Sequence, residues 1–281
     1  MLALLLLFFL PDLSTQFAEI ARPAAGKVGA SVMLIETGAQ AGFHAGDHFP
    51  MQSVYKFPIA MAALHLVDSG KLNLDQTVPI AKAELAPPGL HSPIRDQHPE
   101  GTSLALRDVI RFAVAESDGT ASDVLLRLCG GPTPVTSYLR GLGINGVIVA
   151  TTELEMSRGP MVQYRNWATP DSMVDLLRAF HSGRGLSPAS HALLEDFMAQ
   201  SNPGPKRIKG LLPPGTRVAH KTGTSGTDGT LTRATNDVGI VTLPNGRHLA
   251  IAIFVSDSTA SLELREEAIA KMARAAWDVL K

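Results

Sequence analysis

A serine and a lysine stand three residues apart, Ser53 and Lys56, at the start of an apolar stretch. If this stretch is helical, both side chains lie on one face, where the amine can accept or share the hydroxyl proton. The N-terminus of that helix would also favour negative charge developing near Ser53. The pair therefore indicates nucleophilic chemistry at a serine, although a capping serine followed by a solvated lysine has the same spacing.

Two later segments have residues that would complete such a site. Residues 116–119 read ESDG between two predicted helices, so Ser117 could face a cleft as a proton shuttle or simply cap the second helix. Residues 220–226 read HKTGTSG at the end of a predicted strand. There Lys221 would supply positive charge, and Gly223 would let a ligand approach the backbone closely. Each segment alone is a common pattern, and only the set is specific.

Hydrophobic periodicity predicts the elements that position these residues. Strands are expected at 28–38, near Phe43, and at 217–220, 237–243 and 248–255, with a hairpin turn at 244–247. Helical periodicity dominates from Ser53 to about Arg207, with start signals at 102–103, 169–170 and 187–188. An amphipathic helix is expected to end the chain.

These elements predict an α/β (α+β) fold with one mostly antiparallel sheet assembled from both ends of the chain. Residues 16–50 and 209–281 would form an α/β sub-domain covered by the terminal helices, and 51–208 an inserted all-helical sub-domain. A cleft between them is the natural site. One local conflict is Pro58, because a helix beginning at Ser53 would aim the missing amide of Pro58 at the carbonyl of Val54.

The bulk composition excludes several classes of function. With 281 residues and a net charge of -1, the chain has a sizeable core but no single-sign field to attract nucleic acid or a membrane surface. A small-molecule partner and a monomer are expected. The single cysteine, Cys129, excludes an internal disulfide and is expected to be a buried small hydrophobe. The nine histidines include no His-x-His or His-Glu-x-x-His, so we expect no metal and no cofactor.

The first residues have the character of a targeting segment. Leu2 to Leu10 form an apolar run that is shorter than the ~20 residues of a membrane span but fits the apolar part of a secretory signal. We therefore predict a signal-peptide remnant at 1–15 and no stable membrane span. An apolar start to a buried N-terminal helix is the alternative, because no basic residue precedes the run.

The three motifs follow one another in the order Ser-x-x-Lys, Ser-Asp-x and Lys-Thr-Gly. From about Phe17 to Lys281 the chain thereby resembles the class A serine β-lactamases and the penicillin-binding proteins. Residues 52–56, roughly 68–74, 152–167, 210–213 and 235–237 are most similar to the PER-like extended-spectrum branch. The resemblance implies a five-stranded sheet and a secreted, periplasmic enzyme that hydrolyses penicillins and cephalosporins, giving antibiotic resistance.

The resemblance also implies roles for the motif residues. Ser53 would attack the lactam carbonyl, with Lys56 or a glutamate acting through a water as the base. The oxyanion would lie between the backbone amides of Ser53 and Thr224. Ser117 would pass a proton to the departing nitrogen, and Lys221 with the hydroxyls of Thr222 and Thr224 would hold the substrate carboxylate beside Gly223.

Departures from the family pattern concern the loop that carries the deacylating glutamate. The resemblance places Glu153 at the general-base position, with Glu155 as the rival, and Ser157 where an asparagine commonly helps to hold the water. Thr151 replaces the usual anchoring arginine, which indicates an unusual Ω-loop. Gly119 replaces the asparagine that normally contacts the substrate.

The sequence allows two interpretations of Arg207. It is either an extra cation for the substrate carboxylate or a surface arginine on the connection between the sub-domains.

Three other functions share part of this pattern. A penicillin-binding D,D-peptidase has Ser-x-x-Lys and Lys-Thr-Gly but lacks the deacylating glutamate, so Glu153 argues against it. A penicillin sensor domain would need a membrane anchor, which the short apolar run does not provide. A glutaminase of related fold would not need the carboxylate grip of Lys221.

Overall fold

The computed structural model describes residues 13–281. The predicted signal segment falls almost entirely on residues 1–12, which lie outside the described residues. The chain beyond it begins with helix α1 (Leu13–Ala21), whose Leu13 and Phe17 are buried. Within residues 13–281 no helix combines the length and the apolar character needed to cross a membrane.

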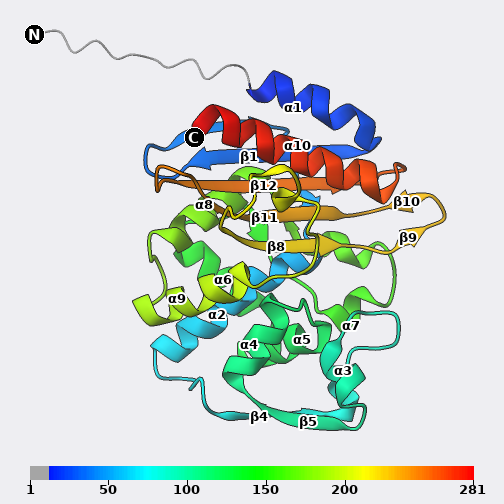
Figure 1. Cartoon of the computed structure of the whole chain (residues 1–281). Coiled ribbons are helices and arrows are strands. Elements are labelled where there is room, and N and C mark those ends of the chain that lie inside the picture. Colours follow the sequence, from blue (N-terminus) through cyan, green and yellow to red (C-terminus); the bar gives the residue numbers. More distant parts are fainter. Residues whose placement is uncertain (1–12) are drawn as a thin grey trace, which may run out of the picture.

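A five-stranded antiparallel sheet forms the centre of the molecule (Figure 1), as predicted. Its strands lie in the order β2 (Ala39–Phe43), β1 (Lys27–Leu34), β12 (His248–Ser256), β11 (Thr235–Thr242) and β8 (Val218–Thr224). The predicted hairpin joins β11 to β12, with Thr242 paired to His248. Nearly every residue of β1, β11 and β12 is buried, because helices cover both faces of the sheet.

The two faces of the sheet have separate hydrophobic cores. On one face lie α1 and the amphipathic α10 (Leu262–Leu280), which contributes Ile269, Met272 and Trp277 to the core (Figure 1). On the other face, α8 (Pro170–His181) packs against β1 and β12, and α9 (Pro188–Ala199) against β8. The second core continues from there into the helical lobe.

The lobe inserted after the first strands is mainly helical. Its helices are α2 (Lys56–Asp68), α3 (Pro93–Gln97), α4 (Leu106–Val114), α5 (Gly119–Leu128), α6 (Pro132–Gly141) and α7 (Glu153–Met156). The single-turn 3-10 segments of the chain are η1 (Arg22–Ala24), η2 (Gln52–Tyr55), η3 (Lys82–Glu84), η4 (Val162–Arg165) and η5 (Ile208–Leu211). Cys129, just after α5, is buried as predicted.

The prediction that 51–208 is all helical is wrong in one respect, because this part of the chain also contains short strands. β4 (Thr77–Ala81) pairs with β5 (Gly101–Ala105), and β6 (Val147–Ile148) and β7 (Trp167–Ala168) form a small sheet with β3 (Phe49–Pro50), which lies just before this range. Thr102 and Ser103 therefore lie in a strand, and α4 begins only at Leu106. A further pair, β9 (Thr227–Asp228) and β10 (Leu231–Thr232), forms a hairpin after β8.

Capping side chains set the starts of several helices. Thr169 accepts a hydrogen bond from the amide of Ser172 at the start of α8, and Ser187 accepts one from Ser190 at the start of α9, as their sequence signals predict. The expected conflict at Pro58 disappears. Because the chain turns through η2 first and α2 begins at Lys56, Pro58 lies in the first helical turn, where its missing amide costs nothing.

Candidate active site

Ser53 and Lys56 lie at the junction between η2 and α2, under the end of strand β8. Lys56 is 2% exposed, and its Nζ lies 2.9 Å from Oε1 of Glu153. The same Nζ donates a hydrogen bond of 2.7 Å to the backbone carbonyl of Ser117. The charge of Lys56 therefore has an ionic partner and a hydrogen-bond acceptor, as a buried charge requires.

Ser117 forms hydrogen bonds with both Lys56 and Lys221. It occupies the loop between α4 and α5 in a left-handed conformation, with φ of 61°. Its Oγ accepts a hydrogen bond of 2.9 Å from Nζ of Lys221, which is completely buried on β8. Burial, reinforced by the nearby positive charge of Lys56, holds the pKa of Lys221 well below its ordinary value. Ser117 is thus the contact point of both motif lysines.

The local sequence around α7 separates the two rival glutamates. Thr152 caps the helix and Glu155 reaches back to the amide of Thr152, a capping box that also binds Glu155 to the hydroxyl of Thr151 at 2.6 Å. Glu155 is thus occupied at the helix start. Glu153 is 6% exposed and points into the pocket toward Lys56.

Asp123 of α5 anchors α7 from below. Its carboxylate accepts the backbone amide of Glu153 at 2.7 Å and that of Leu154 at 3.0 Å. Burial raises the pKa of Asp123 to about 6, although these two hydrogen bonds oppose the rise. Sequence reasoning missed this residue, because nothing local to α5 indicates a contact with a segment thirty residues further on.

Strand β8 passes so close to Ser53 that only glycine fits at position 223. A Cβ on Gly223 would lie 2.3 Å from the carbonyl oxygen of Met51 and 3.2 Å from the amide nitrogen of Ser53. Asn236, paired with Gly223 on β11, donates to the carbonyls of Pro50 and Met51 at 2.8 and 3.1 Å. These contacts fix the backbone of the Ser53 turn against the strand that carries Thr224.

Arg207 is buried, so the interpretation as a surface arginine is wrong. Its guanidinium donates to the carbonyls of Gly223 and Asn236 and, at 2.8 Å, to the hydroxyl of Thr224. Its Nε lies 3.1 Å from Glu266 of α10. Arg207 therefore lies behind β8 and reaches the cleft through the hydroxyl of Thr224.

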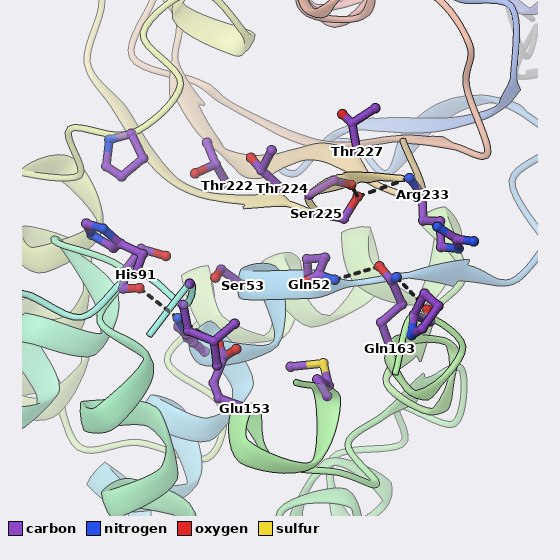
Figure 2. A pocket seen from close by; sticks show the side chains of 18 of the residues that line it. Gln52, Ser53, His91, Glu153, Gln163, Thr222, Thr224, Ser225, Thr227 and Arg233 are labelled. Atoms are coloured by element: carbon purple, nitrogen blue, oxygen red, sulfur yellow. Dashed lines mark hydrogen bonds and ion pairs between the residues drawn. The ribbon is translucent and has the colours of Figure 1, made fainter. Parts of the chain in front are cut away.

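These elements surround a cleft of about 590 Å³. Figure 2 shows Ser53 on one side and Thr222 and Thr224 on the other, with Glu153 beyond the serine. The predicted residues that line it are Ser53, Lys56, Ser117, Glu153, Thr222 and Thr224. Lining residues to which the sequence analysis gave no role include His91, Arg233, and Gln52 with Gln163, whose side chains share a hydrogen bond of 2.6 Å.

Of the predicted substrate-binding residues, only Thr222 and Thr224 line the cleft: Lys221, Gly223 and Arg207 lie on or behind β8 without lining it, and Gly119 and Ser157 are not brought to it either. Gly119 is buried, its amide donates to the carbonyl of His91, and a Cβ there would lie 3.2 Å from that carbonyl oxygen, so His91 lines the cleft in its place. Ser157 is exposed at the end of α7, and its hydroxyl donates to the carbonyl of Leu154. Neither prediction is supported by this geometry.

Asp118, the neighbour of Ser117, has a structural part in the site. Its buried carboxylate caps α5 and accepts hydrogen bonds from the hydroxyl of Ser92 and the amides of Ile94 and Ala121. Burial raises the pKa of this carboxyl above its usual value despite those bonds. The Ser-Asp motif therefore fixes the loop that presents Ser117 between the two lysines.

Comparison with known proteins identifies the family. The Beta-lactamase enzyme family profile matches residues 12–280. The extended-spectrum β-lactamase PER-1 of Pseudomonas aeruginosa is 41% identical over 231 residues, which cover 82% of this chain and 75% of the relative. β-Lactamase VEB-1 of the same organism is 40% identical over 233 residues, covering 82% and 78%.

Two solved structures of similar fold are also β-lactamases. A β-lactamase from Chitinophaga pinensis is 45% identical with a TM-score of 0.93, covering 96% of this chain and 100% of that one. The TLA-3 extended-spectrum β-lactamase is 39% identical, also with a TM-score of 0.93, covering 96% and 99%. The fold is thus that of a hydrolase with a class A architecture. The chain belongs to the β-lactamase enzyme family, as a class A enzyme that hydrolyses β-lactams.

Proposed function

We propose that this enzyme hydrolyses penicillins and cephalosporins, including oxyimino-cephalosporins, through a covalent acyl-enzyme on Ser53. The observation that carries the proposal is the buried pair of Lys56 and Glu153 at 2.9 Å, next to Ser53 in one cleft. A carboxylate in this place can serve both the attack of the serine and the later attack of water.

In the acylation step the Ser53 hydroxyl loses its proton and its Oγ bonds to the lactam carbonyl carbon. Lys56 already donates to Glu153 and to the carbonyl of Ser117, so the carboxylate of Glu153 is the final proton acceptor, reached through Lys56 or through a water. The oxyanion lies between the amides of Ser53 and Thr224, which the close packing of Gly223 supports.

Ring opening breaks the bond between the carbonyl carbon and the lactam nitrogen, and that nitrogen takes up a proton. Ser117 is positioned to deliver it, since its Oγ accepts from Lys221 and its own proton remains available. The cationic Lys221 and the hydroxyls of Thr222 and Thr224 hold the substrate carboxylate. Arg207 supports Thr224 from behind.

Deacylation separates this function from its rivals. Glu153 removes a proton from water, which then attacks the acyl carbonyl and releases Ser53. A D,D-peptidase or a penicillin sensor lacks such a base and stays acylated, so the placement of Glu153 favours a β-lactamase. The proposed substrate range rests on the names of PER-1 and TLA-3, which are extended-spectrum enzymes.

The family resemblance supports a secreted, periplasmic enzyme that confers antibiotic resistance, and we propose that the enzyme is a monomer. Export would depend on the apolar residues before Leu13. A periplasmic extract that contains the activity, and its loss from that extract when residues 2–10 are deleted, would test this.

Turnover of a penicillin and of an oxyimino-cephalosporin, followed by loss of ring absorbance, tests the proposed function. We expect multiple turnovers of both by the native chain and none by Ser53→Ala, with Ser225→Ala as a control for loss of another hydroxyl at the cleft. Near-normal turnover by Ser53→Ala would refute the assignment, and hydrolysis of the penicillin alone would refute the extended range.

A further inference from the structure

Three metal-ligating side chains from distant parts of the chain meet at the ends of the sheet strands that lie away from the cleft. Glu36 follows β1, His181 ends α8, and His248 begins β12. One ligand atom of each lies within 4.8 Å of those of the other two. This is the one such group among residues 13–281.

Backbone pairing brings these residues together. Leu34 is paired with Leu249, and the amide of Ile35 donates to the carbonyl of His248 at 2.9 Å, so the turn that holds Glu36 lies beside His248. Nδ1 of His248 is 2.8 Å from Oε1 of Glu36, and the backbone amide of His248 also donates to this carboxylate. α8 packs against β1 and β12 and places the His181 ring 4.2 Å from the His248 ring.

We propose that Glu36, His181 and His248 form a binding site for a divalent transition-metal ion such as Zn²⁺. Two imidazoles and one carboxylate are ligands that zinc accepts, with a water in the fourth position. Ligand atoms around tetrahedral zinc lie roughly 3.3 Å apart, given metal–ligand distances of about 2.0–2.1 Å. From separations of 4.8 Å or less, side-chain movements on the order of an ångström close the site.

The site is open enough to load and to retain a water. The side chains of His248 and Glu36 are 27% and 35% exposed, and His181 is half-buried. On binding, the metal takes the place of the proton shared by Glu36 and His248, and the carboxylate moves from hydrogen-bond acceptor to ligand. Because one coordination position faces solvent, we expect weaker binding than in a closed four-ligand site.

A metal ion at this site would link the turn after β1, the end of α8 and the start of β12, and it would lie away from the catalytic cleft. His248 pairs with Thr242, whereas the cleft end of β11 is at Thr235, which pairs with Thr224. The site and the cleft thus lie at opposite ends of the same strands. The metal is therefore expected to raise thermal stability and to leave β-lactam hydrolysis unchanged.

Isothermal titration of the untagged full chain with zinc chloride tests the proposal. We expect one saturable site per chain, a rise in the melting temperature with zinc, and tetrahedral cobalt absorption bands when Co²⁺ replaces Zn²⁺. His181→Asn and His248→Asn should each weaken binding by about tenfold or more, and Glu36→Gln by a smaller factor. His98→Asn, in the helical lobe, is the matched control and should bind like the native chain.

Hydrolytic activity and the metal-free melting temperature of each variant establish that it is folded. Absence of a saturable site in the native chain would overturn the proposal. Undiminished binding by folded His181→Asn and His248→Asn would also overturn it, because the zinc would then be held by other surface groups.

Discussion

Lys56 and Glu153 form a buried ion pair with 2.9 Å between Nζ and Oε1, although 97 positions separate them in the chain. The pair joins the first helix of the lobe to the loop helix α7, and the carbonyl of Ser117 completes the surroundings of the ammonium. Removing one partner from such a pair leaves an unpaired buried charge. The same contact therefore serves the stability of the site and its chemistry.

Separate substitution of Glu153 and Glu155 distinguishes the roles of the two glutamates. Glu153→Gln keeps the size of the side chain but removes the base that activates water, whereas Lys56, no longer paired with a carboxylate, can still accept the Ser53 proton. Deacylation should therefore slow by about 10²–10⁴-fold, more than acylation, and a Ser53 adduct should accumulate. Glu155→Gln breaks part of a capping box and should cost at most about 1 kcal/mol of stability, with hydrolysis largely retained. Mass spectrometry after mixing with a cephalosporin measures the adduct. Its accumulation in Glu155→Gln and not in Glu153→Gln would reverse the assignment.

Arg207→Lys keeps the buried charge but loses the planar fork that binds Gly223, Asn236 and Thr224. The hydrogen bond from Arg207 leaves the proton of the Thr224 hydroxyl free to point at the substrate carboxylate. We expect KM to rise by about tenfold with a smaller change in kcat, since a hydrogen bond to a charged group contributes roughly 1.5 kcal/mol or more. Arg217→Lys, at an exposed pair with Glu195, is the control. An unchanged KM in Arg207→Lys would show that the arginine has no part in binding.

The lowered pKa of Lys221 predicts the alkaline behaviour of the enzyme. Burial and the charge of Lys56 depress this pKa below the ordinary 10.5, so Lys221 loses its proton at a lower pH than a solvated lysine. The charged form holds the substrate carboxylate, so kcat/KM should fall as the pH rises through the depressed pKa. The fall should be smaller for the methyl ester of the same substrate, which has no carboxylate. Identical alkaline limbs for acid and ester would contradict this role.

Asp123 predicts a pH dependence of stability. Its pKa is about 6 in the folded chain against an ordinary 3.8, so the folded state binds more protons than the unfolded state between these values. The free energy of unfolding should therefore fall as the pH rises from about 4 to about 6, by on the order of 2–3 kcal/mol from this group. Asp123→Asn should flatten this part of the profile in denaturant titrations. A profile that keeps its slope in the variant would place the proton on another group.

Local signals explain which parts of the fold the sequence predicts. The strands of the central sheet and the starts of α8 and α9 depend on apolar runs, turn residues and capping side chains within a few positions of one another. The pairing of β4 with β5 depends on contacts such as Val78 with Leu104, so the strand character of Thr102 and Ser103 was hidden by their resemblance to a helix start. Pairing with the distant strand β4 therefore determines the conformation of residues 102–103.

The residues of the candidate site also fall into two groups, those that local motifs predict and those that only tertiary contacts define. Ser53, Lys56, Ser117 and Lys221 belong to short motifs, whereas Glu153 was preferred over Glu155 only by the family resemblance; the Thr152–Glu155 capping box that occupies Glu155 is seen in the structure. Asp123, His91 and the group of Glu36, His181 and His248 are defined by tertiary contacts between distant segments. Contacts between residues so far apart in the sequence leave no spacing pattern from which they could be predicted.

The most direct test of the acyl-enzyme mechanism mixes the native enzyme with a chromogenic cephalosporin and follows mass and absorbance in the same sample. We predict rapid multiple turnover with an adduct on Ser53 that appears only transiently, because Glu153 drives its release. A stable stoichiometric adduct, or turnover with no adduct on Ser53 at any time, would contradict it.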